Sequence, residues 1–215
     1  MSQEMFTMNI IKKIFNNTGK PEGFFGKMMV NSMNSGHAKV SDWGISNFPD
    51  IKPERIVDLG CGGGRNTKVF LKKYPDAHVT AMDYSDISVA ATEKLNNEEI
   101  QNGRCKVIEG NVKNIPLPDK EFNLATAFET IYFWPNPEKC FKEVYRILKH
   151  DSYFIITNEA DGETDKDKNW ENTIDNMKIY KIDEICAMLK NAGFTSVSVR
   201  RMEKNSWVSF IAHKL

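Results

Sequence analysis

Apolar and polar positions alternate with two different periods along this chain. Short apolar runs predict strands, and the stretches between them, where apolar residues recur three or four positions apart, predict helices. The expected strands cover residues 55–58, 78–83, 106–109, 122–128, 153–157, 196–201 and 207–212, and the expected helices cover residues 66–74, 86–96, 137–148 and 181–191. Strands that alternate with helices favour a parallel sheet with helices on both faces. A tight turn at residues 204–205 joins the last two strands, so we expect them to close the sheet as a hairpin.

The first part of the chain has a different pattern. Apolar residues at helical spacing within 6–15 predict a short amphipathic helix, and a methionine-rich stretch over 24–34 predicts a second one. A Gly-Lys-Pro-Glu-Gly break at 19–23 separates them. We therefore expect an N-terminal helical cap over residues 1–50, laid on a core domain over residues 51–215.

Composition limits the class of protein. The chain has 215 residues, a formal net charge of zero and four cysteines without a C-x-x-C pair. A balanced charge argues against nucleic-acid binding, which needs a basic surface, and the cysteine pattern argues against a metal site and for a reducing compartment. No signal peptide and no apolar run long enough for a membrane span is visible. We expect a cytoplasmic protein that does not bind membranes and is a monomer or a homodimer.

The most informative motif covers residues 56–65, where an apolar run ends in Asp58 and glycines follow at Gly60, Gly62 and Gly64. Glycine allows positive φ and lets a ligand approach the bare backbone, so a strand, a glycine turn and a helix start predict a nucleotide-type site. Arg65 stands where a dinucleotide fingerprint has its third glycine, and the Lys-Ser/Thr of a P-loop is missing. A carboxylate before the loop suits a ligand with a cationic amino group.

This combination resembles motif I of the class I S-adenosylmethionine-dependent methyltransferases, in the type 11-like group of small-molecule enzymes. The resemblance continues through residues 115–124, similar to "LP-x-x-D-x-x-FD", and residues 138–149, similar to "E-x-x-R-x-LKPGG". Asn123 replaces an Asp, and residues 149–152 lack the Pro-Gly-Gly. The resemblance implies a Rossmann-like, doubly wound α/β fold with a seven-stranded, mostly parallel sheet and a C-terminal antiparallel hairpin. It also implies S-adenosyl-L-methionine as cofactor, with S-adenosyl-L-homocysteine as product.

The resemblance also implies cofactor contacts. Asp83, at the end of the second predicted strand, would bind both ribose hydroxyls, or else only cap the following turn. Tyr84 could pack on the adenine. Asn111 stands where the family has an Asp that takes the adenine amino group, with the N–H of Val112 beside it; an Asx turn is the alternative. The expected cofactor-binding residues are Asp58, Gly60, Cys61, Gly62, Gly64, Asp83, Tyr84, Asn111, Val112 and Glu129.

The run Glu129–Trp134 follows the fourth predicted strand, beside the methyl group in folds of this kind. Glu129 could act as a base, and the ring of Tyr132 could attract a sulfonium cation, although packing would explain the aromatic residues equally well. Histidine has an unperturbed pKa of about 6.5, so His37 could take a proton from a hydroxyl or an amine. The expected catalytic residues are His37, Glu129 and Tyr132, and the expected substrate-binding residues are His37, Trp43, Tyr132 and Trp170. The last lies in the polar segment 161–175, which is either a mobile lid or a solvated loop.

The sequence therefore predicts methyl transfer to a small-molecule acceptor by in-line displacement, without a metal. A cofactor-binding regulatory protein or subunit without transfer activity is the alternative. A nicotinamide oxidoreductase is disfavoured by Arg65. A nucleic-acid methyltransferase would need a basic groove or an Asn-Pro-Pro-Tyr-like motif, where this chain has residues 129–132 instead.

Overall fold

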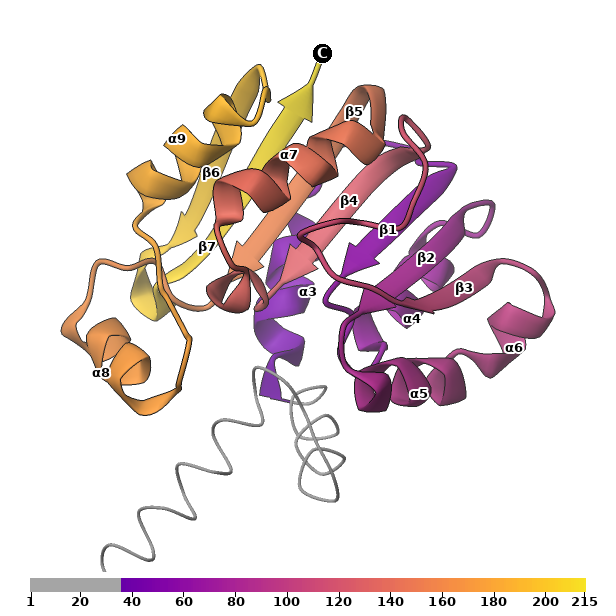
Figure 1. Ribbon diagram of the computed structural model, residues 1–215, viewed down its shortest axis with the longest axis horizontal. Helices are drawn as coiled ribbons and strands as arrows, with labels where there is room; N and C mark the ends of the chain where they lie inside the picture. Colours follow the sequence, from indigo (N-terminus) through magenta and orange to yellow (C-terminus); the bar gives the residue numbers. More distant parts are fainter. Residues whose placement is uncertain (1–35) are drawn as a thin grey trace, which may run out of the picture.

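The computed structural model describes residues 36–215, and its centre is one seven-stranded sheet (Figure 1). The strand order is β3-β2-β1-β4-β5-β7-β6, and all strands except β7 run in the same direction. The strands are β1 (Arg55–Leu59), β2 (His78–Asp83), β3 (Cys105–Glu109), β4 (Phe122–Phe128), β5 (Leu148–Asn158), β6 (Ser196–Met202) and β7 (Trp207–Lys214). This order confirms the predicted doubly wound, mostly parallel sheet with its C-terminal antiparallel hairpin. The predicted helices within residues 6–15 and 24–34 lie outside the described residues.

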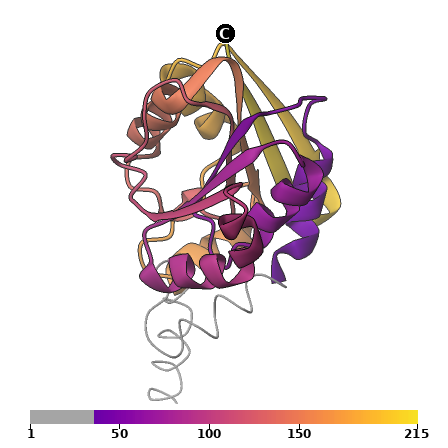
Figure 2. The same ribbon diagram turned by 90° about the vertical axis from the view of Figure 1, so that its right-hand side faces the viewer.

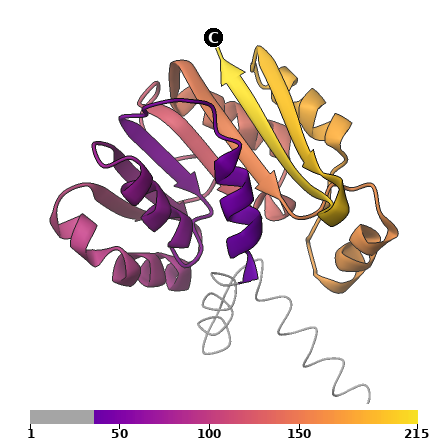
Figure 3. The same ribbon diagram turned by 180° about the vertical axis from the view of Figure 1, so that it is seen from behind.

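Helices cover both faces of the sheet. Helices α7 and α9 lie in front of it in Figure 1, and α3 and α4 lie on the opposite face, which Figure 3 shows from behind. Seen along its edge in Figure 2, the sheet is twisted between these two layers, as the handedness of strands requires. The helices are α3 (Ala38–Ser46), α4 (Arg65–Lys73), α5 (Asp86–Leu95), α6 (Asn97–Gln101), α7 (Pro137–Ile147), α8 (Asp165–Thr173) and α9 (Ile182–Asn191). Short 3-10 helices cover Ile131–Phe133 and Glu203–Asn205.

Each face of the sheet has its own apolar core. Under α7 and α9, Phe141 from the helix packs edge-on against Phe154 from β5, with ring centroids 5.6 Å apart. On the other face, Phe70 of α4 and Phe128 of β4 pack together beside Phe48, which follows α3. Burial on both faces explains why the central strands have continuous apolar runs rather than alternating ones.

Helix α3 packs directly on the sheet although it belongs to the first 50 residues. Its Gly44 lies against Thr157 of β5 so closely that a Cβ on the glycine would come within 2.4 Å of the threonine Oγ1. On the same face, Trp43 packs on Trp207 of β7, with ring centroids 6.0 Å apart. The start of the described chain is therefore held on the sheet near the ends of β5 and β7.

Most predicted elements have nearly the bounds observed, and the differences have local causes. Strand β5 begins at Leu148, directly after α7, because Leu148 pairs with Phe122 of β4. Residues 149–152, which the predicted bounds leave between a helix and a strand, are therefore part of the strand, with Asp151 in the left-handed region at φ +56°. Helix α6 was not predicted. Helix α8 lies inside the polar segment 161–175, where Thr164 and Asp167 form a capping box.

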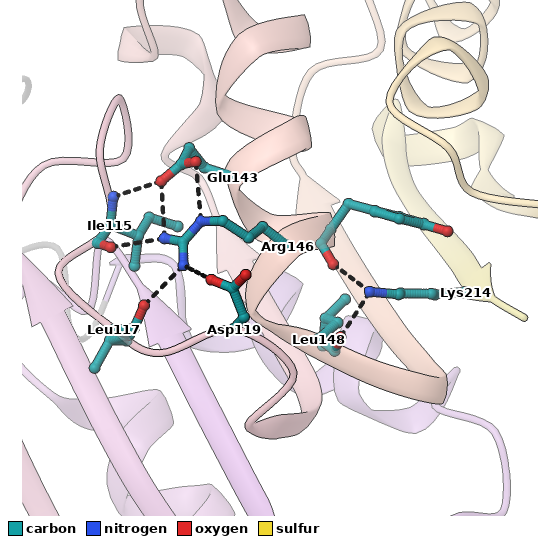
Figure 4. A network of polar contacts seen from close by, with 8 residues as sticks. Ile115, Leu117, Asp119, Glu143, Arg146, Leu148 and Lys214 are labelled. Carbon is teal, nitrogen blue, oxygen red and sulfur yellow. Dashed lines mark hydrogen bonds and ion pairs between the residues drawn. The ribbon is translucent and has the colours of Figure 1, made fainter.

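The loop between β3 and β4 is tied to α7 by one side chain (Figure 4). The Arg146 guanidinium donates to the carbonyl oxygens of Ile115 and Leu117, both at 2.9 Å, and pairs with Asp119 at 2.6 Å. Glu143, one turn earlier on the helix, pairs with the same guanidinium and accepts from the Ile115 N–H. Helix α7 thus fixes the course of a loop that begins at the carboxyl end of β3. In the same figure, Lys214 donates to the carbonyl oxygen of Leu148.

Candidate functional site

The glycine loop after β1 combines a backbone conformation that glycine adopts readily with close packing at two of its three glycines. Gly60, Gly62 and Gly64 have φ of +74°, +55° and +77°. The N–H groups of Gly60 and Cys61 both donate to the carbonyl oxygen of Met82, which holds the loop against the end of β2. A Cβ on Gly60 would lie 2.3 Å from Thr130 Oγ1, whereas one on Gly62 would meet nothing within 4 Å. The loop therefore packs inward at Gly60 and faces open space at Gly62.

Gly64 and Cys61 face α5 rather than open space. A Cβ on Gly64 would lie within 3 Å of Thr92 and Asn96, so this glycine allows the start of α4 to approach α5. The Cys61 Sγ is buried 3.4 Å from the Thr92 hydroxyl, which donates to the Gly62 carbonyl oxygen. The described structure therefore gives Gly64 a packing role between two helices.

Asp58 lies beneath the loop. Its carboxylate accepts from the hydroxyls of Thr67 and Thr126, both at 2.9 Å, and the residue is 2 % exposed. Burial raises the pKa of Asp58 to about 6, although these two hydrogen bonds oppose the shift. Asp58 is not among the described residues that line the two cavities next to the glycine loop. Asp58 supports the loop from below, and its direct contact with the cofactor stays a prediction.

Asp83 ends β2 beside the loop and is almost fully buried. Its Oδ2 accepts from the Gly62 N–H at 2.9 Å, and its Oδ1 accepts from the Ser85 N–H at 3.0 Å. Burial raises the pKa of this carboxyl group above its ordinary value, while the backbone N–H groups of Ser85, Gly62 and Tyr84 oppose the shift. Each oxygen of an ionised carboxylate has capacity for a second hydrogen bond. Asp83 thus forms the predicted turn and still presents acceptors to a ligand.

A cavity of about 560 Å³ opens at the carboxyl ends of the strands, where ligands bind in sheets of this kind. Asp83 and Tyr84 stand on one side, next to Asn111 and Val112 from the loop after β3. The Asn111 Oδ1 accepts from the Lys113 N–H, so the Asx turn is present, and its side chain still lines the cavity. The other residues on the wall are Gly60, Gly62, Met82, Ser88, Gly110, Lys113, Phe128, Glu129, Thr130, Tyr132, Phe133, Trp134, Pro135, Asn136, Asn176, Lys178 and Tyr180.

A second, smaller cavity of about 50 Å³ lies between the glycine loop and the start of α3. It is lined by His37, Ser41, Gly60, Cys61, Gly62, Gly63, Arg65, Asn66, Phe128 and Glu129. Arg65 pairs with Asp42 of α3 at 2.7 Å, which links the loop to that helix. Gly60, Gly62, Phe128 and Glu129 line both cavities, so these four residues mark the boundary where the cavities adjoin, which we name the passage.

Glu129 stands in this passage in a strained conformation. It follows β4 with φ +55°, its N–H donates to Thr157, and its carboxylate accepts from the Glu159 N–H. The Tyr132 hydroxyl, which accepts from the Ala160 N–H at 3.2 Å, donates to the same carboxylate. Non-glycine residues with positive φ persist only where their surroundings hold them, and they cluster at functional sites. The contacts above hold Glu129 in the wall of the passage.

Glu129 lies beside two other ionisable side chains, those of His37 and Glu159. The His37 Nδ1 lies 3.9 Å from a Glu129 oxygen and 3.7 Å from a Glu159 oxygen, and the ligand atoms of the three all lie within 4.8 Å of one another. Burial raises the pKa of Glu129 to about 8, and the charge of Glu159 adds to the shift. Burial lowers the pKa of His37, but the two carboxylates outweigh this effect and raise it. The group can share a proton or hold a cationic partner.

Two expected substrate residues lie elsewhere. Trp43 packs on Trp207, and Trp170 packs beside the small cluster of Tyr132, Ala160 and Ile179. Neither tryptophan is among the described residues that line the two cavities. Their roles in substrate binding have no support from this arrangement.

Sequence reasoning missed other residues of the site. Glu159 directly follows β5, as Glu129 directly follows β4. Ligands bind at the carboxyl ends of such strands, so the reasoning that located Glu129 would also have located Glu159. Lys178 and Tyr180, after α8, also line the large cavity, and the Lys178 N–H donates to the Tyr132 carbonyl oxygen at 2.9 Å. That contact joins segments far apart in the chain, and nothing in the local sequence indicates it.

Comparisons with known proteins agree with this geometry. The family model "Methyltransferase domain" matches residues 57–156, which include most of β1, the glycine loop and most of β5. The matched residues therefore form a methyltransferase domain; the fold and the relatives that match this chain support its class I S-adenosylmethionine-dependent type, whose cofactor is S-adenosyl-L-methionine. Both expectations from the sequence are confirmed.

Individual relatives are distant. The chain is 27 % identical over 157 residues to sterol 24-C-methyltransferase erg-4 of Neurospora crassa, covering 68 % of this chain and 41 % of that protein. It is 26 % identical over 156 residues to 2-methyl-6-phytyl-1,4-hydroquinone methyltransferase of Arabidopsis thaliana, covering 73 % and 44 %. The chain thus spans less than half the length of these two relatives. The structure of a SAM dependent methyltransferase from Aquifex aeolicus superposes with a TM-score of 0.71 at 19 % identity, covering 88 % of this chain and 98 % of that one, which shows the shared fold.

Proposed function

We propose that this chain moves a methyl group from S-adenosyl-L-methionine to a small-molecule acceptor by in-line displacement. One observation supports this most directly: a buried carboxylate, Asp83, stands beside a glycine loop that is open at Gly62, at the carboxyl edge of a doubly wound sheet. When bound, the cofactor supplies a methyl group on a sulfonium that leaves as a neutral thioether.

The residues present fit such a cofactor. Asp83 would accept hydrogen bonds from the ribose hydroxyls, and Tyr84, Asn111 and Val112 would surround the adenine in the large cavity. The open face of the loop at Gly62 leaves room for a ligand against the backbone, in a position where a side chain would project into the cavity. Glu129 completes the proposed contacts in the passage between the cavities.

The protein's part in the reaction is then positioning and proton handling. Holding two reactants in line is worth up to about 7–11 kcal/mol of the barrier, without any proton for the leaving group. Glu129, with Tyr132 and His37 beside it, is placed to take a proton from an acceptor that arrives protonated. Residues 1–50 are proposed to cap the core domain. We also propose a cytoplasmic location and a monomer or homodimer.

In the described part of the chain, no helix has both the length and the apolar character for a membrane crossing. The names of the two relatives point to sterols and hydroquinones as acceptor classes to test first. A fatty-acid O-methyltransferase of Mycolicibacterium smegmatis, to which the chain is 24 % identical over 156 residues, adds fatty acids. For this chain we propose that the acceptor is a small molecule.

Titration calorimetry with S-adenosyl-L-methionine, S-adenosyl-L-homocysteine and NAD tests the cofactor. Micromolar binding of the first two and none of NAD is expected. Binding of NAD alone, or of none of the three, would overturn the proposal. A radiolabelled methyl donor with a hydroquinone, a sterol and a fatty acid then tests the transfer. Cofactor binding without label transfer to any acceptor would favour a cofactor-binding protein that lacks transfer activity.

A further inference from the structure

A ligand that fills both cavities runs past the described residues that the two cavities share, which include Glu129. The larger cavity has the room and the carboxylate for a nucleoside, and the smaller one lies against Arg65 and the glycine loop. A nucleoside joined to an amino acid through a sulfonium would therefore place its sulfonium near the passage, beside Glu129. This step rests on the proposed function.

The charges facing the passage favour a cation. Glu129 has a side chain only 7 % exposed, and His37, Tyr132 and Glu159 face it from the start of α3, the 3-10 helix and the end of β5. Behind the glycine loop lie the carboxylates of Asp58 and Asp83 and the Cys61 thiol, and the Tyr132 hydroxyl is also within the field of Asp167. Across the smaller cavity, Arg65 already pairs with Asp42. A buried carboxylate beside a second carboxylate is costly to ionise, so the empty group retains a proton on Glu129 or its neighbours.

We propose that Glu129, His37 and Glu159 form a proton-exchanging cation subsite that holds a proton when empty and releases it when a sulfonium ligand binds. The positive charge of the ligand then replaces the positive charge of the proton, so the net charge of the passage is conserved. Glu159, with a side chain 46 % exposed, gives the departing proton a route to solvent. The step breaks the O–H or N–H bond that holds the shared proton and transfers that proton to water or buffer, and no other covalent bond changes.

This exchange separates the two forms of the cofactor. S-adenosyl-L-homocysteine has the same nucleoside and amino acid but no sulfonium charge. Its binding therefore releases fewer protons per bound ligand on average. Raising the pH removes the competing proton and strengthens binding of the cation. With the pKa of Glu129 at about 8, affinity for S-adenosyl-L-methionine is expected to rise roughly tenfold from pH 7 to pH 8.5, and affinity for the homocysteine form much less.

The test is calorimetry of the full chain at pH 7 in two buffers with different ionisation enthalpies, which gives the number of protons released on binding. S-adenosyl-L-methionine should release more than half a proton, and S-adenosyl-L-homocysteine clearly less. Glu129→Gln should abolish the difference between the two ligands, and Glu159→Gln, at the rim, should reduce it. The matched control Glu93→Gln changes an exposed acid of α5 and should release protons as the wild type does.

Each outcome is decisive. Equal proton release by both ligands in the wild type would overturn the inference and leave the proposed cofactor in place. If Glu159→Gln keeps the full wild-type difference in proton release between the two ligands, the inference is also overturned. This outcome can be read even if Glu129→Gln does not fold. If S-adenosyl-L-methionine does not bind at all, the proposed function fails, and this inference fails with it.

Discussion

Two glycines of one loop should respond differently to the same substitution. Gly60 and Gly62 both have positive φ, so an alanine at either position carries a backbone penalty of about 1–2 kcal/mol. At Gly60 the new Cβ would also lie 2.3 Å from Thr130 Oγ1, which accepts a hydrogen bond from Trp134 Nε1 at 3.0 Å. Moving Thr130 adds about 1–3 kcal/mol for overpacking and about 1 kcal/mol for the disturbed hydrogen bond. Gly60→Ala should therefore lose about 3–6 kcal/mol of unfolding free energy.

Gly62→Ala is the matched control, because its Cβ meets no protein atom within 4 Å. Its unfolding free energy should fall only by the backbone penalty, but the methyl group would project into the space that both cavities share. Its affinity for S-adenosyl-L-homocysteine should then fall at least tenfold. Urea unfolding followed by tryptophan fluorescence, together with calorimetry, measures both quantities. Equal stability losses in the two variants, or unchanged ligand affinity in Gly62→Ala, would refute the reasoning.

Three further predictions concern the acids and the loop anchor. Asp83→Asn replaces one acceptor by a donor that faces a backbone N–H, so affinity for S-adenosyl-L-homocysteine should fall roughly 10–100-fold in calorimetry; unchanged affinity would exclude the ribose contact. Arg146→Met keeps the apolar stem but removes the anchor of residues 115–119. Amide hydrogen exchange in residues 115–119 should quicken, and the unfolding free energy should fall by about 1–2 kcal/mol. Unchanged exchange in these residues would contradict the anchor role. Burial raises the pKa of Glu129 to about 8 and of Asp58 to about 6, so the folded protein binds more protons than the unfolded chain from about pH 4.5 to pH 8. The unfolding free energy of the unliganded protein should therefore fall between pH 5.5 and pH 8.5, and less steeply in Glu129→Gln; a rise with pH would contradict the sign.

Local pattern was sufficient where the physics is local. Strands β2 and β4 have the predicted bounds, because each apolar run is buried on both faces and ends at a polar or strained residue, Asp83 and Glu129. The start of β5 depends on pairing between Leu148 and Phe122, which lie far apart in the chain. Periodicity carries no information about such a pair. Helix α8 had a local signal in Thr164 and Asp167 that the polar composition of its segment obscured.

The candidate site divides in the same way. Residues at the ends of β1, β2, β3 and β4 could be grouped from sequence, because parallel strands present their carboxyl ends at one edge. Which way a side chain at such an end points could not be predicted. Asp58 turns under the loop toward Thr67 and Thr126, whereas Asp83 faces the cavity beside Gly62. Those directions depend on helix α4 and strand β4, which the local sequence does not describe.

The antiparallel position of β7 has a consequence for biosynthesis. Strand β6 pairs only through β7, which lies between it and β5, so a nascent chain that has emerged as far as β6 cannot yet attach that strand to the sheet. Until β7 is made, the long β5 edge is open, with Phe154 and Ile156 on the side that later becomes core. An open apolar edge of this kind is a template for aggregation. Emergence of β7 from the ribosome, rather than completion of the glycine loop, is thus the moment at which this sheet becomes protected from association with other unfinished chains.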